Sequence, residues 1–337
     1  MRPRSFGVAV LLAATLAGCA GPPPAATRPP DRAGPTPPVA TVADCGTTGV
    51  SVVRDTAALT AAIAAARPGS VIALAPGTYG AVEVASAGSA DAPITLCGPR
   101  DAVVDGGSTT DGYTVHVEDA RYWTLRGFTV RGGQKGVMLD GAQHVVLDGL
   151  LVTGTGDEGV HLRRNSTDNV VRGLTVRDTG LRQAKFGEGI YIGSAESNWC
   201  ELTDCRPDRS DRNVVEDNTI SETTAESVDV KEGTTGGVVR GNTFDGAGMS
   251  AADAWVDVKG NGWTITGNRG TAAPTDGFQV HEITDGWGVD NTFSANTASV
   301  AADGYVVNVT RNADRNTVTC DNAAVGAAKG ISRGRCR

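Results

Sequence analysis

The sequence has few of the features that mark helical, metal-binding or nucleic-acid-binding proteins. Helix signals are almost confined to residues 56–67. There are only three methionines and no cluster of His, Cys and Met, which argues against copper handling. No Cys/His pair has the short spacing of a zinc site. The formal charge is −8, and about −10 without Arg2 and Arg4, so broad attraction to nucleic acid is not expected.

The apolar run near the start is too short to cross a membrane. Residues 6–16 follow two arginines, whereas a bilayer needs roughly 20 apolar residues. The pattern predicts a secretory signal over residues 1–18. It ends in Leu16-Ala17-Gly18-Cys19, which resembles the bacterial lipobox and implies lipidation of Cys19. The alternative is an ordinary signal peptide with a chance cysteine.

Residues 19–43 are predicted to form a linker. Eight of the fifteen prolines lie between residues 21 and 43, where no strand or helix pattern occurs. Such a segment is an extended, semi-rigid spacer. A lipid on Cys19 would tether it to a membrane and present the remaining domain, residues 44–337. We therefore expect an extracytoplasmic protein, lipid-anchored to the bacterial cell membrane, and a monomer.

Six cysteines remain once Cys19 is acylated. An even number in an exported protein favours disulfides over a metal site. Many pairings are possible, and the most local one would staple the entry of the fold, one long loop and the exit. This hypothesis pairs Cys45 with Cys97, Cys200 with Cys205, and Cys320 with Cys336.

The rest of the chain repeats like a β-solenoid. Asp55 can cap an Ala-rich helix over residues 56–67, and short β-branched strands broken by Gly, Asn and Asp follow it. A Gly/Asp–X pair then recurs at steps of 22 to 26 residues, with one step of 44. We interpret that step as one or two coils carrying an insertion over residues 194–212. The pairs begin at Gly127, Gly149, Gly173, Asp217, Gly241 and Gly267.

This repeat predicts an all-β protein, a right-handed single-stranded parallel β-helix with a short N-terminal capping helix. A β-sandwich also has many short strands, but its strands would not repeat in phase. Asn218, Asn242 and Asn268 share one phase and predict an asparagine ladder. The arrangement resembles the pectate-lyase-like superfamily, in which a short amphipathic helix covers the first coil.

One strand in each coil reads apolar–X–apolar, so residue X points to solvent. Neighbouring rungs are about 4.8 Å apart, and residues at the same phase can touch. The first outward column is predicted to contain Met138, His161, Tyr191, Asp229, Asp257 and Gln279. The second column, two residues on, is predicted to contain Asp140, Arg163, Gly193, Lys231, Lys259, His281 and Asn308. An acidic set precedes the strands: Glu158, Glu188, Glu226, Asp276 and Asp303.

Ionisable residues gather on one part of this face. The protein has five lysines, and Lys231 and Lys259 fall at the same phase of adjacent coils. A solvated β face is the simpler interpretation, because exposed Asp–Lys pairs contribute only about 0–1 kcal/mol each. The candidate cluster consists of Glu226, Asp229, Lys231, Asp257, Lys259 and His281.

Part of this cluster resembles the chondroitinase-B and alginate-lyase family of β-helix lyases, whose motif is Glu-x-Glu-x-x-Ser-x-Lys-Ser. Residues 226–231 keep the five-residue step from glutamate to lysine. The resemblance implies a calcium ligand at Glu226 and a base at Lys231. Three positions differ: Thr224 replaces the first glutamate, serine is missing before the lysine, and Lys259 stands where an arginine is expected.

These residues suggest a polysaccharide lyase that cleaves a uronate-containing glycan by β-elimination. The reaction needs a base, a positive charge beside the carboxylate, and an acid for the leaving oxygen. Lys231 is the candidate base and Lys259 the neutralising charge, while His281 or Tyr191 supplies the acid. Oxygen-seeking Ca²⁺ would suit the carboxylates. The candidate calcium ligands are Glu226, Asp229 and Asp257, and the candidate substrate-binding residues are His161, Arg163, Trp255 and Gln279.

Two other function classes stay open. Asp229 and Asp257 on adjacent rungs could serve a glycoside hydrolase, since retaining enzymes hold two carboxyl groups about 5–5.5 Å apart. Alternatively, the face could bind an acidic or neutral polysaccharide without cleaving it. Stacking surfaces for that role are offered by Trp199, Trp255, Trp263 and Tyr191.

Overall fold

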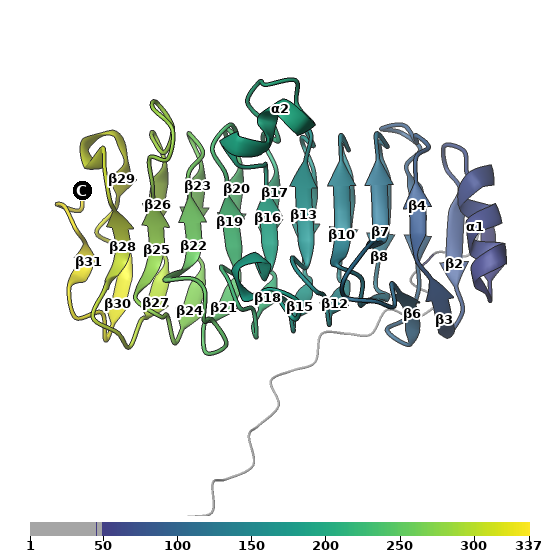
Figure 1. Cartoon of the computed structure of the whole chain (residues 1–337), viewed down its shortest axis with the longest axis horizontal. Coiled ribbons are helices and arrows are strands. Elements are labelled where there is room, and N and C mark those ends of the chain that lie inside the picture. Colours follow the sequence, from purple (N-terminus) through teal and green to yellow (C-terminus); the bar gives the residue numbers. More distant parts are fainter. Residues whose placement is uncertain (1–44, 46–48) are drawn as a thin grey trace, which may run out of the picture. The chain divides into compact units, whose positions relative to one another are not determined.

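The computed structural model describes residue 45 and residues 49–337, which form one parallel β-solenoid (Figure 1). The predicted signal, the Cys19 lipidation site and the linker lie outside the described residues. Strands stack into three parallel sheets, because each coil contributes one strand to each sheet. Among the described residues, no helix has the length and apolar character needed to cross a membrane. The predicted all-β parallel β-helix is confirmed.

The first sheet has 11 strands. They are β1 (Val50–Val53), β2 (Val71–Leu74), β5 (Ile94–Cys97), β8 (Trp123–Arg126), β11 (Val146–Asp148), β14 (Val170–Arg172), β17 (Val214–Glu216), β20 (Val238–Arg240), β23 (Thr264–Thr266), β26 (Thr292–Ser294) and β29 (Thr317–Val318). The second sheet has 10 strands. They are β3 (Gly77–Gly80), β6 (Ala102–Asp105), β9 (Thr129–Arg131), β12 (Leu151–Thr153), β15 (Thr175–Arg177), β18 (Thr219–Ile220), β21 (Thr243–Asp245), β24 (Arg269–Thr271), β27 (Thr297–Ser299) and β30 (Ala323–Val325).

The third sheet, which carries the predicted site, also has 10 strands. They are β4 (Val82–Val84), β7 (Tyr113–Glu118), β10 (Lys135–Asp140), β13 (Val160–Arg163), β16 (Ile190–Ile192), β19 (Val228–Val230), β22 (Ala254–Val258), β25 (Asp276–Val280), β28 (Tyr305–Val309) and β31 (Gly330–Ser332). The helices are α1 (Thr56–Ala65), α2 (Trp199–Leu202) and the 3₁₀ turns η2 (Ala184–Phe186), η3 (Glu196–Asn198) and η4 (Ala313–Arg315).

Helix α1 covers the first coil, as the sequence predicts (Figure 1). The Asp55 carboxylate caps it by accepting a hydrogen bond of 2.8 Å from the Ala58 amide. Leu59 and Ile63 are its buried residues. The helix therefore shields the open apolar end of the solenoid from solvent and from other chains.

The repeated Gly/Asp–X pairs mark one tight turn in each coil. All six predicted turn residues have positive φ, including Gly173 at 62° and Asp217 at 55°. The predicted asparagine ladder is confirmed and is longer than expected, because buried side-chain amides run from Asn218 to Asn322. Each amide also caps backbone groups of neighbouring coils, so the turns satisfy their buried polar groups internally.

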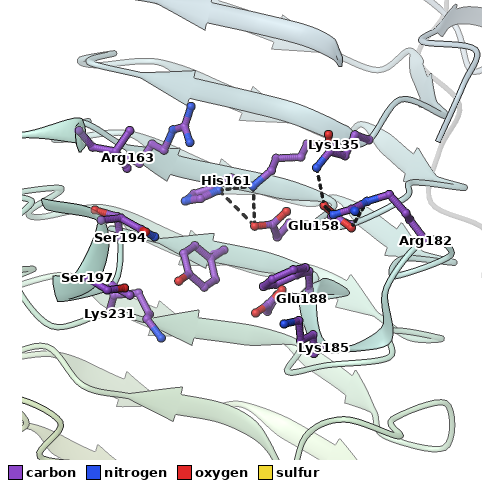
Figure 2. Close-up of a pocket in the computed structure, with 17 residues that line it drawn as sticks. Lys135, Glu158, His161, Arg163, Arg182, Lys185, Glu188, Ser194, Ser197 and Lys231 are labelled. Carbon is purple, nitrogen blue, oxygen red and sulfur yellow. Dashed lines mark hydrogen bonds and ion pairs between the residues drawn. The ribbon is translucent and has the colours of Figure 1, made fainter. Parts of the chain in front are cut away.

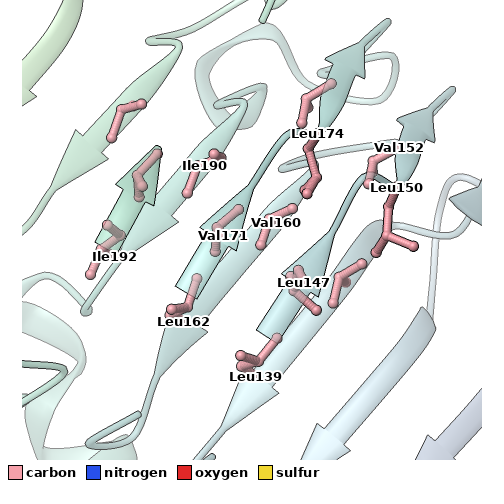
Figure 3. Packing of buried hydrophobic residues seen from close by; sticks show 14 of the residues in the cluster. Leu139, Leu147, Leu150, Val152, Val160, Leu162, Val171, Leu174, Ile190 and Ile192 are labelled. Atoms are coloured by element: carbon pink, nitrogen blue, oxygen red, sulfur yellow. The ribbon is translucent and has the colours of Figure 1, made fainter. Parts of the chain in front are cut away.

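The interior is filled by the apolar residues that flank each outward side chain. Figure 3 shows Leu139, Val160, Leu162, Ile190 and Ile192 from three successive coils packed in rows. Each of these residues is fully buried. A side chain in such rows contacts its counterparts one coil above and below, so register is fixed by burial.

The three disulfides are those that the sequence suggests. Cys45 is bonded to Cys97, Cys200 to Cys205, and Cys320 to Cys336. The first and third lie at the two ends of the described solenoid, and the second closes a surface loop. This arrangement confirms the most local pairing.

The outward columns of the third sheet are in register. Strand pairing places each member of the first column beside the next, in the order Met138, His161, Tyr191, Asp229, Asp257 and Gln279. Asn308 pairs with Gln279, so it belongs to the first column and its assignment to the second is wrong. Strand β14 pairs directly with β17, so the 44-residue step is a single coil.

Candidate active site

Two loops of a single coil turn the flat sheet face into a pocket. The coil that contains β16 carries one insertion before that strand, residues 180–187, and another after it, residues 194–212. These loops rise on opposite sides of the sheet near β13 and β16 (Figures 1 and 2). We call residues 180–187 the front wall and residues 194–212 the back wall.

The back wall is fixed to the solenoid by buried polar contacts. Asp208 is fully buried and accepts hydrogen bonds from the Ser194 hydroxyl and from the amides of Arg164 and Asn165. The Trp199 indole donates to the Ser194 carbonyl oxygen over 3.0 Å. Together with the Cys200–Cys205 disulfide, these contacts hold the wall in one position.

Between the walls lies a pocket of about 590 Å³. Its floor is formed by side chains of β10, β13, β16 and the segment after β19 (Figure 2). The cationic residues that line it are Lys135, Arg163, Arg182, Lys185 and Lys231, and the acidic ones are Asp157, Glu158 and Glu188. The pocket is therefore rich in positive charge, which suits an acidic ligand.

On one side of the floor, His161 is held between the Gly193 carbonyl group and Lys135. Its Nε2 lies 2.9 Å from the Gly193 carbonyl oxygen, which can only accept, so Nε2 carries the proton. Nδ1 then accepts a hydrogen bond from Lys135 Nζ at 3.2 Å, and Lys135 is also paired with Glu158 at 2.7 Å. Burial and the Lys135 charge lower the pKa of His161, so the imidazole is neutral near pH 7.

Tyr191 and Lys231 converge at the centre of the pocket. The Tyr191 ring packs edge-on against His161, with 4.4 Å between the ring centroids, and Lys231 Nζ lies 5.4 Å from the Tyr191 centroid. Burial and the nearby charge of Asp229 raise the pKa of Tyr191 well above its ordinary value. The phenol therefore keeps its proton at neutral pH.

Beside this pair is an acidic cluster composed of Glu188, Glu226 and Asp229. One oxygen from each carboxylate lies within 4.8 Å of the others. Glu188 is 5% exposed, and its Oε2 is buried without a hydrogen-bond partner. Burial raises the pKa of Glu188, with contributions from neighbouring carboxylates, and burial together with Asp229 raises the pKa of Glu226 to about 7. The three carboxylates therefore do not all remain charged unless protons or a cation neutralise part of their charge.

Further along the sheet, the remaining predicted residues form a buried ion network. Lys259 Nζ lies 2.7 Å from Asp229 and 2.5 Å from Asp257. Burial would lower the pKa of Lys259, but these two carboxylates raise it well above its ordinary value. His281 Nε2 lies 2.6 Å from Gln279 Oε1, and neither residue lines the pocket.

The chain has relatives among solved structures. No known family model matches the sequence, and no curated protein sequence matches it. Among solved structures, the chain is similar to an alginate lyase from Paenibacillus sp. str. FPU-7, with 36% sequence identity and a TM-score of 0.79. The alignment covers 86% of this chain and 100% of that chain. The chain belongs to the family of this alginate lyase.

Two more distant structures share the fold of this alginate-lyase family. The pectate lyase Pel9A aligns with 86% of the chain and 82% of its own length, at 16% identity and a TM-score of 0.54. A mannuronic acid specific polysaccharide family 6 lyase from human gut microbiota aligns with 86% of the chain and 77% of its own length, at 15% identity and a TM-score of 0.54. The predicted pectate-lyase-like fold is confirmed.

Only some of the predicted site residues lie together in the pocket. His161, Arg163, Tyr191 and Lys231 line the pocket. Lys259, His281, Gln279 and Asp257 do not line it, although Lys259 shares the Asp229 carboxylate with the pocket residue Lys231. Asp257 is also absent from the acidic cluster, where Glu188 takes the place predicted for it.

The prediction that tryptophan side chains offer stacking surfaces for sugars is wrong. Trp255 is 0% exposed and packs against Phe244 and Phe278 in the core, and its indole nitrogen donates to the Thr271 carbonyl oxygen. Trp263 is also fully buried, and Trp199 is buried within the back wall. These rings contribute to stability rather than to sugar binding.

The two hydrolase carboxyl groups are also unsuited to their predicted roles. Asp229 and Asp257 share one ammonium group, that of Lys259, and both are buried outside the pocket lining. Burial would raise the pKa of Asp229, but Lys259 and Lys231 lower it, so Asp229 cannot serve as a proton donor near neutral pH.

Sequence reasoning missed the residues that the walls contribute. Lys185, Phe186, Arg182 and Ser197 lie in irregular loops, and no repeat phase marks them. Lys135 precedes the aligned triplet of its strand, so the column alignment excluded it. The only available signal was the 44-residue step, which indicates extra surface on that one coil.

Proposed function

We propose that the protein is a polysaccharide lyase that cleaves a uronate-containing polysaccharide, alginate being the first candidate, by β-elimination in the walled pocket. The observation that carries this proposal is the convergence of Tyr191 and Lys231 in a cation-rich pocket. Family membership with an alginate lyase supports it. The cations attract an acidic glycan, and the pocket supplies the acid and the base that elimination requires.

Lys231 is the proposed base and Tyr191 the proposed acid. Lys231 Nζ lies 3.3 Å from Asp229, but Lys259 is closer to the same carboxylate, at 2.7 Å. Lys231 is therefore the less tightly paired of the two lysines, and it would have to be in its amine form to take the proton on C5 of the uronate. The Tyr191 phenol carries a proton at neutral pH, because burial and Asp229 raise its pKa, and it is the proposed donor to the leaving glycosidic oxygen.

The neutral His161 imidazole orients this acid. Its Nε2 proton is committed to the Gly193 carbonyl oxygen, and its ring contacts Tyr191 edge-on. His161 is thus rigidly placed and holds the Tyr191 ring at the pocket floor. Arg163 lies at the pocket edge, where Asp140 holds its guanidinium in position for an acidic sugar.

The acidic cluster is the proposed site for Ca²⁺. Glu188, Glu226 and Asp229 provide carboxylate oxygens, the ligand type that Ca²⁺ prefers, and Glu188 Oε2 is buried without a partner. Such an ion would supply positive charge beside the uronate carboxylate and so ease removal of the C5 proton. Without an ion the two glutamates would tend to hold protons, as their raised pKa values indicate, whereas Asp229 stays charged beside Lys259 and Lys231.

The test is to incubate the protein with alginate, polygalacturonate and chondroitin sulfate and to follow the ultraviolet absorbance of unsaturated uronate ends. We expect activity on at least one of these polymers, with loss of activity in Lys231→Ala and Tyr191→Phe. Binding without cleavage of any polymer would overturn the lyase proposal. Activity that is unchanged after chelation of divalent cations, and not raised by added Ca²⁺, would overturn the calcium proposal alone.

We also propose that Cys19 anchors the mature protein to the membrane. The support is the Leu16-Ala17-Gly18-Cys19 sequence and the Pro-rich segment after it. Expression of the full chain and of Cys19→Ser in a bacterium, followed by membrane fractionation, tests this. Equal membrane association of the two proteins would contradict it.

A further inference from the structure

The front wall presents a cation and an aromatic ring that the proposed reaction does not use. Lys185 and Phe186 lie in η2, and both side chains line the pocket (Figure 2 labels Lys185). Lys185 Nζ lies 4.6 Å from the Phe186 ring centroid. The two groups therefore form one surface that faces the ligand space.

Lys185 differs from the other cations of the pocket in having no counter-ion. Each of the other four has a carboxylate partner: Lys135 with Glu158, Arg163 with Asp140, Arg182 with Asp157, and Lys231 with Asp229. Lys185 takes part in no ion pair within residues 49–337. Its charge is thus available to an incoming carboxylate without breaking an existing pair.

Phe186 is one of few large apolar side chains exposed on the described surface. It is 38% exposed and shares the front wall with Leu181, which is 61% exposed but does not line the pocket. An aromatic face at the edge of a sugar-sized pocket can pack against the C–H groups of a pyranose ring. That contact removes apolar surface from water on binding rather than on folding.

Hydrogen bonds and close backbone packing tie the front wall to the solenoid, which would preorganise Lys185 and Phe186 for a ligand. The Thr179 hydroxyl donates to the Gly187 carbonyl oxygen over 2.6 Å, and the Thr224 hydroxyl donates to the Ala184 carbonyl oxygen over 2.9 Å. Gly180, at φ +77°, packs so closely on Gly187 that a side chain on Gly187 would collide with Gly180 and with Thr224. A fixed surface loses little conformational entropy when a ligand binds.

We infer that Lys185 and Phe186 form a uronate-binding subsite, in which Lys185 binds the carboxylate of one sugar and Phe186 packs against the ring of that sugar. This inference rests on the proposed lyase function and adds to it a subsite that holds a sugar neighbouring the one at Tyr191 and Lys231. It assigns the front wall a role in recognising acidic sugars and gives the two residues no part in proton transfer.

The experiment compares Lys185→Gln and Phe186→Ala with two matched controls in the full chain. Leu181→Ala removes an exposed apolar side chain from the same wall, and Lys329→Gln removes a lysine from a distant coil. Kinetics are measured on alginate oligosaccharides of defined length at several salt concentrations. Calorimetric binding in a Tyr191→Phe background uses the same oligosaccharides and versions with their carboxyl groups reduced to alcohols.

We expect Lys185→Gln to raise KM about tenfold, with kcat close to wild type and a weaker salt dependence of kcat/KM. It should weaken binding of the native oligosaccharides but not of the reduced ones, whereas Phe186→Ala should weaken both. The controls should behave like wild type. An active enzyme in which Lys185→Gln leaves KM and binding unchanged would overturn this inference and leave the lyase proposal standing. If no polymer is cleaved, the lyase proposal fails, and the binding comparison still decides the subsite.

Discussion

Two neighbouring stretches of the same sheet face have the same register but different surroundings. Around β13 and β16, the outward residues His161 and Tyr191 lie on the floor of a pocket with a wall on each side. Around β22 and β25, the equivalent residues Asp257 and Gln279 are buried in a network of ion pairs and hydrogen bonds. Equivalent positions of the repeat thus form a pocket floor in one stretch and a buried polar network in the other.

The difference comes from the insertions in a single coil. A solenoid gives every coil the same strand positions, so the repeat alone does not create a cavity. The β16 coil adds both walls, whereas the coils of β22 and β25 do not contribute to the pocket. A charged residue at an outward position of the repeat is therefore a candidate site residue, and the loops of its coil decide whether a ligand can reach it.

The largest difference between the two stretches should appear in kcat. Tyr191→Phe removes the proposed acid with little change in shape, and we expect kcat to fall at least about 100-fold. His281→Gln, in the buried network, should leave kcat close to wild type, although the sequence suggests His281 as an alternative acid. Steady-state kinetics on the preferred polymer measure both. A large kcat loss in His281→Gln with Tyr191→Phe active would reverse the assignment.

Removing the central cation of the buried network should mainly affect stability. Lys259→Met leaves Asp229 and Asp257 buried without their shared partner, and we expect a loss of about 3–5 kcal/mol in the free energy of unfolding. Lys185→Gln, on the exposed wall, should change it by less than about 0.5 kcal/mol. Urea denaturation followed by circular dichroism measures the two. Equal stabilities would show that the network does not hold the sheet.

The acidic cluster at the boundary of the two stretches should make stability depend on pH. The pKa of Glu226 is about 7 in the folded chain against 4.5 for the ordinary group. Between these values the folded state binds more protons than the unfolded state, so stability falls as pH rises through this window. The loss should approach about 3 kcal/mol at pH 8 when divalent cations are chelated.

Glu226→Gln is the matched variant for that measurement. It keeps the size of the side chain and removes the titration, so its stability should vary less between pH 5 and pH 8 than that of the wild type. Added Ca²⁺ should raise the wild-type stability at pH 8 and have less effect on the variant. A wild type whose stability rises between pH 5 and pH 8 without divalent cations would show that Glu226 is charged throughout.

The smallest expected effect concerns the anchor of the front wall. Thr224→Val keeps the shape but removes the hydroxyl that donates to the Ala184 carbonyl oxygen. We expect a loss of about 0.5–1.5 kcal/mol in stability and a modest rise in KM, because Lys185 and Phe186 become less fixed. Thr317→Val, which alters a strand position far from the pocket, is the control for kinetics. An unchanged KM in Thr224→Val would show that the wall is held by its other contacts.

The sequence by itself determined the solenoid. The Gly/Asp turns, the Asn218–Asn242–Asn268 phase and the apolar–X–apolar strands each follow from one local rule repeated along the chain, so register could be assigned without coordinates. The same periodicity placed His161, Tyr191, Asp229 and Asp257 in one column. The local disulfide pairing also followed, because nearby cysteines close the shortest loops.

Only the tertiary structure decided which part of that column is a site. The walls are irregular, so no period predicts where Lys185 or Phe186 will lie, and the burial of Trp255 depends on how neighbouring coils pack. Thr224, which the sequence shows only as a departure from a lyase motif, proves to anchor the front wall through its hydroxyl. Repetition can be read from a sequence because each coil repeats the same contacts. A pocket depends on loops that interrupt the repeat and meet only when the chain is folded.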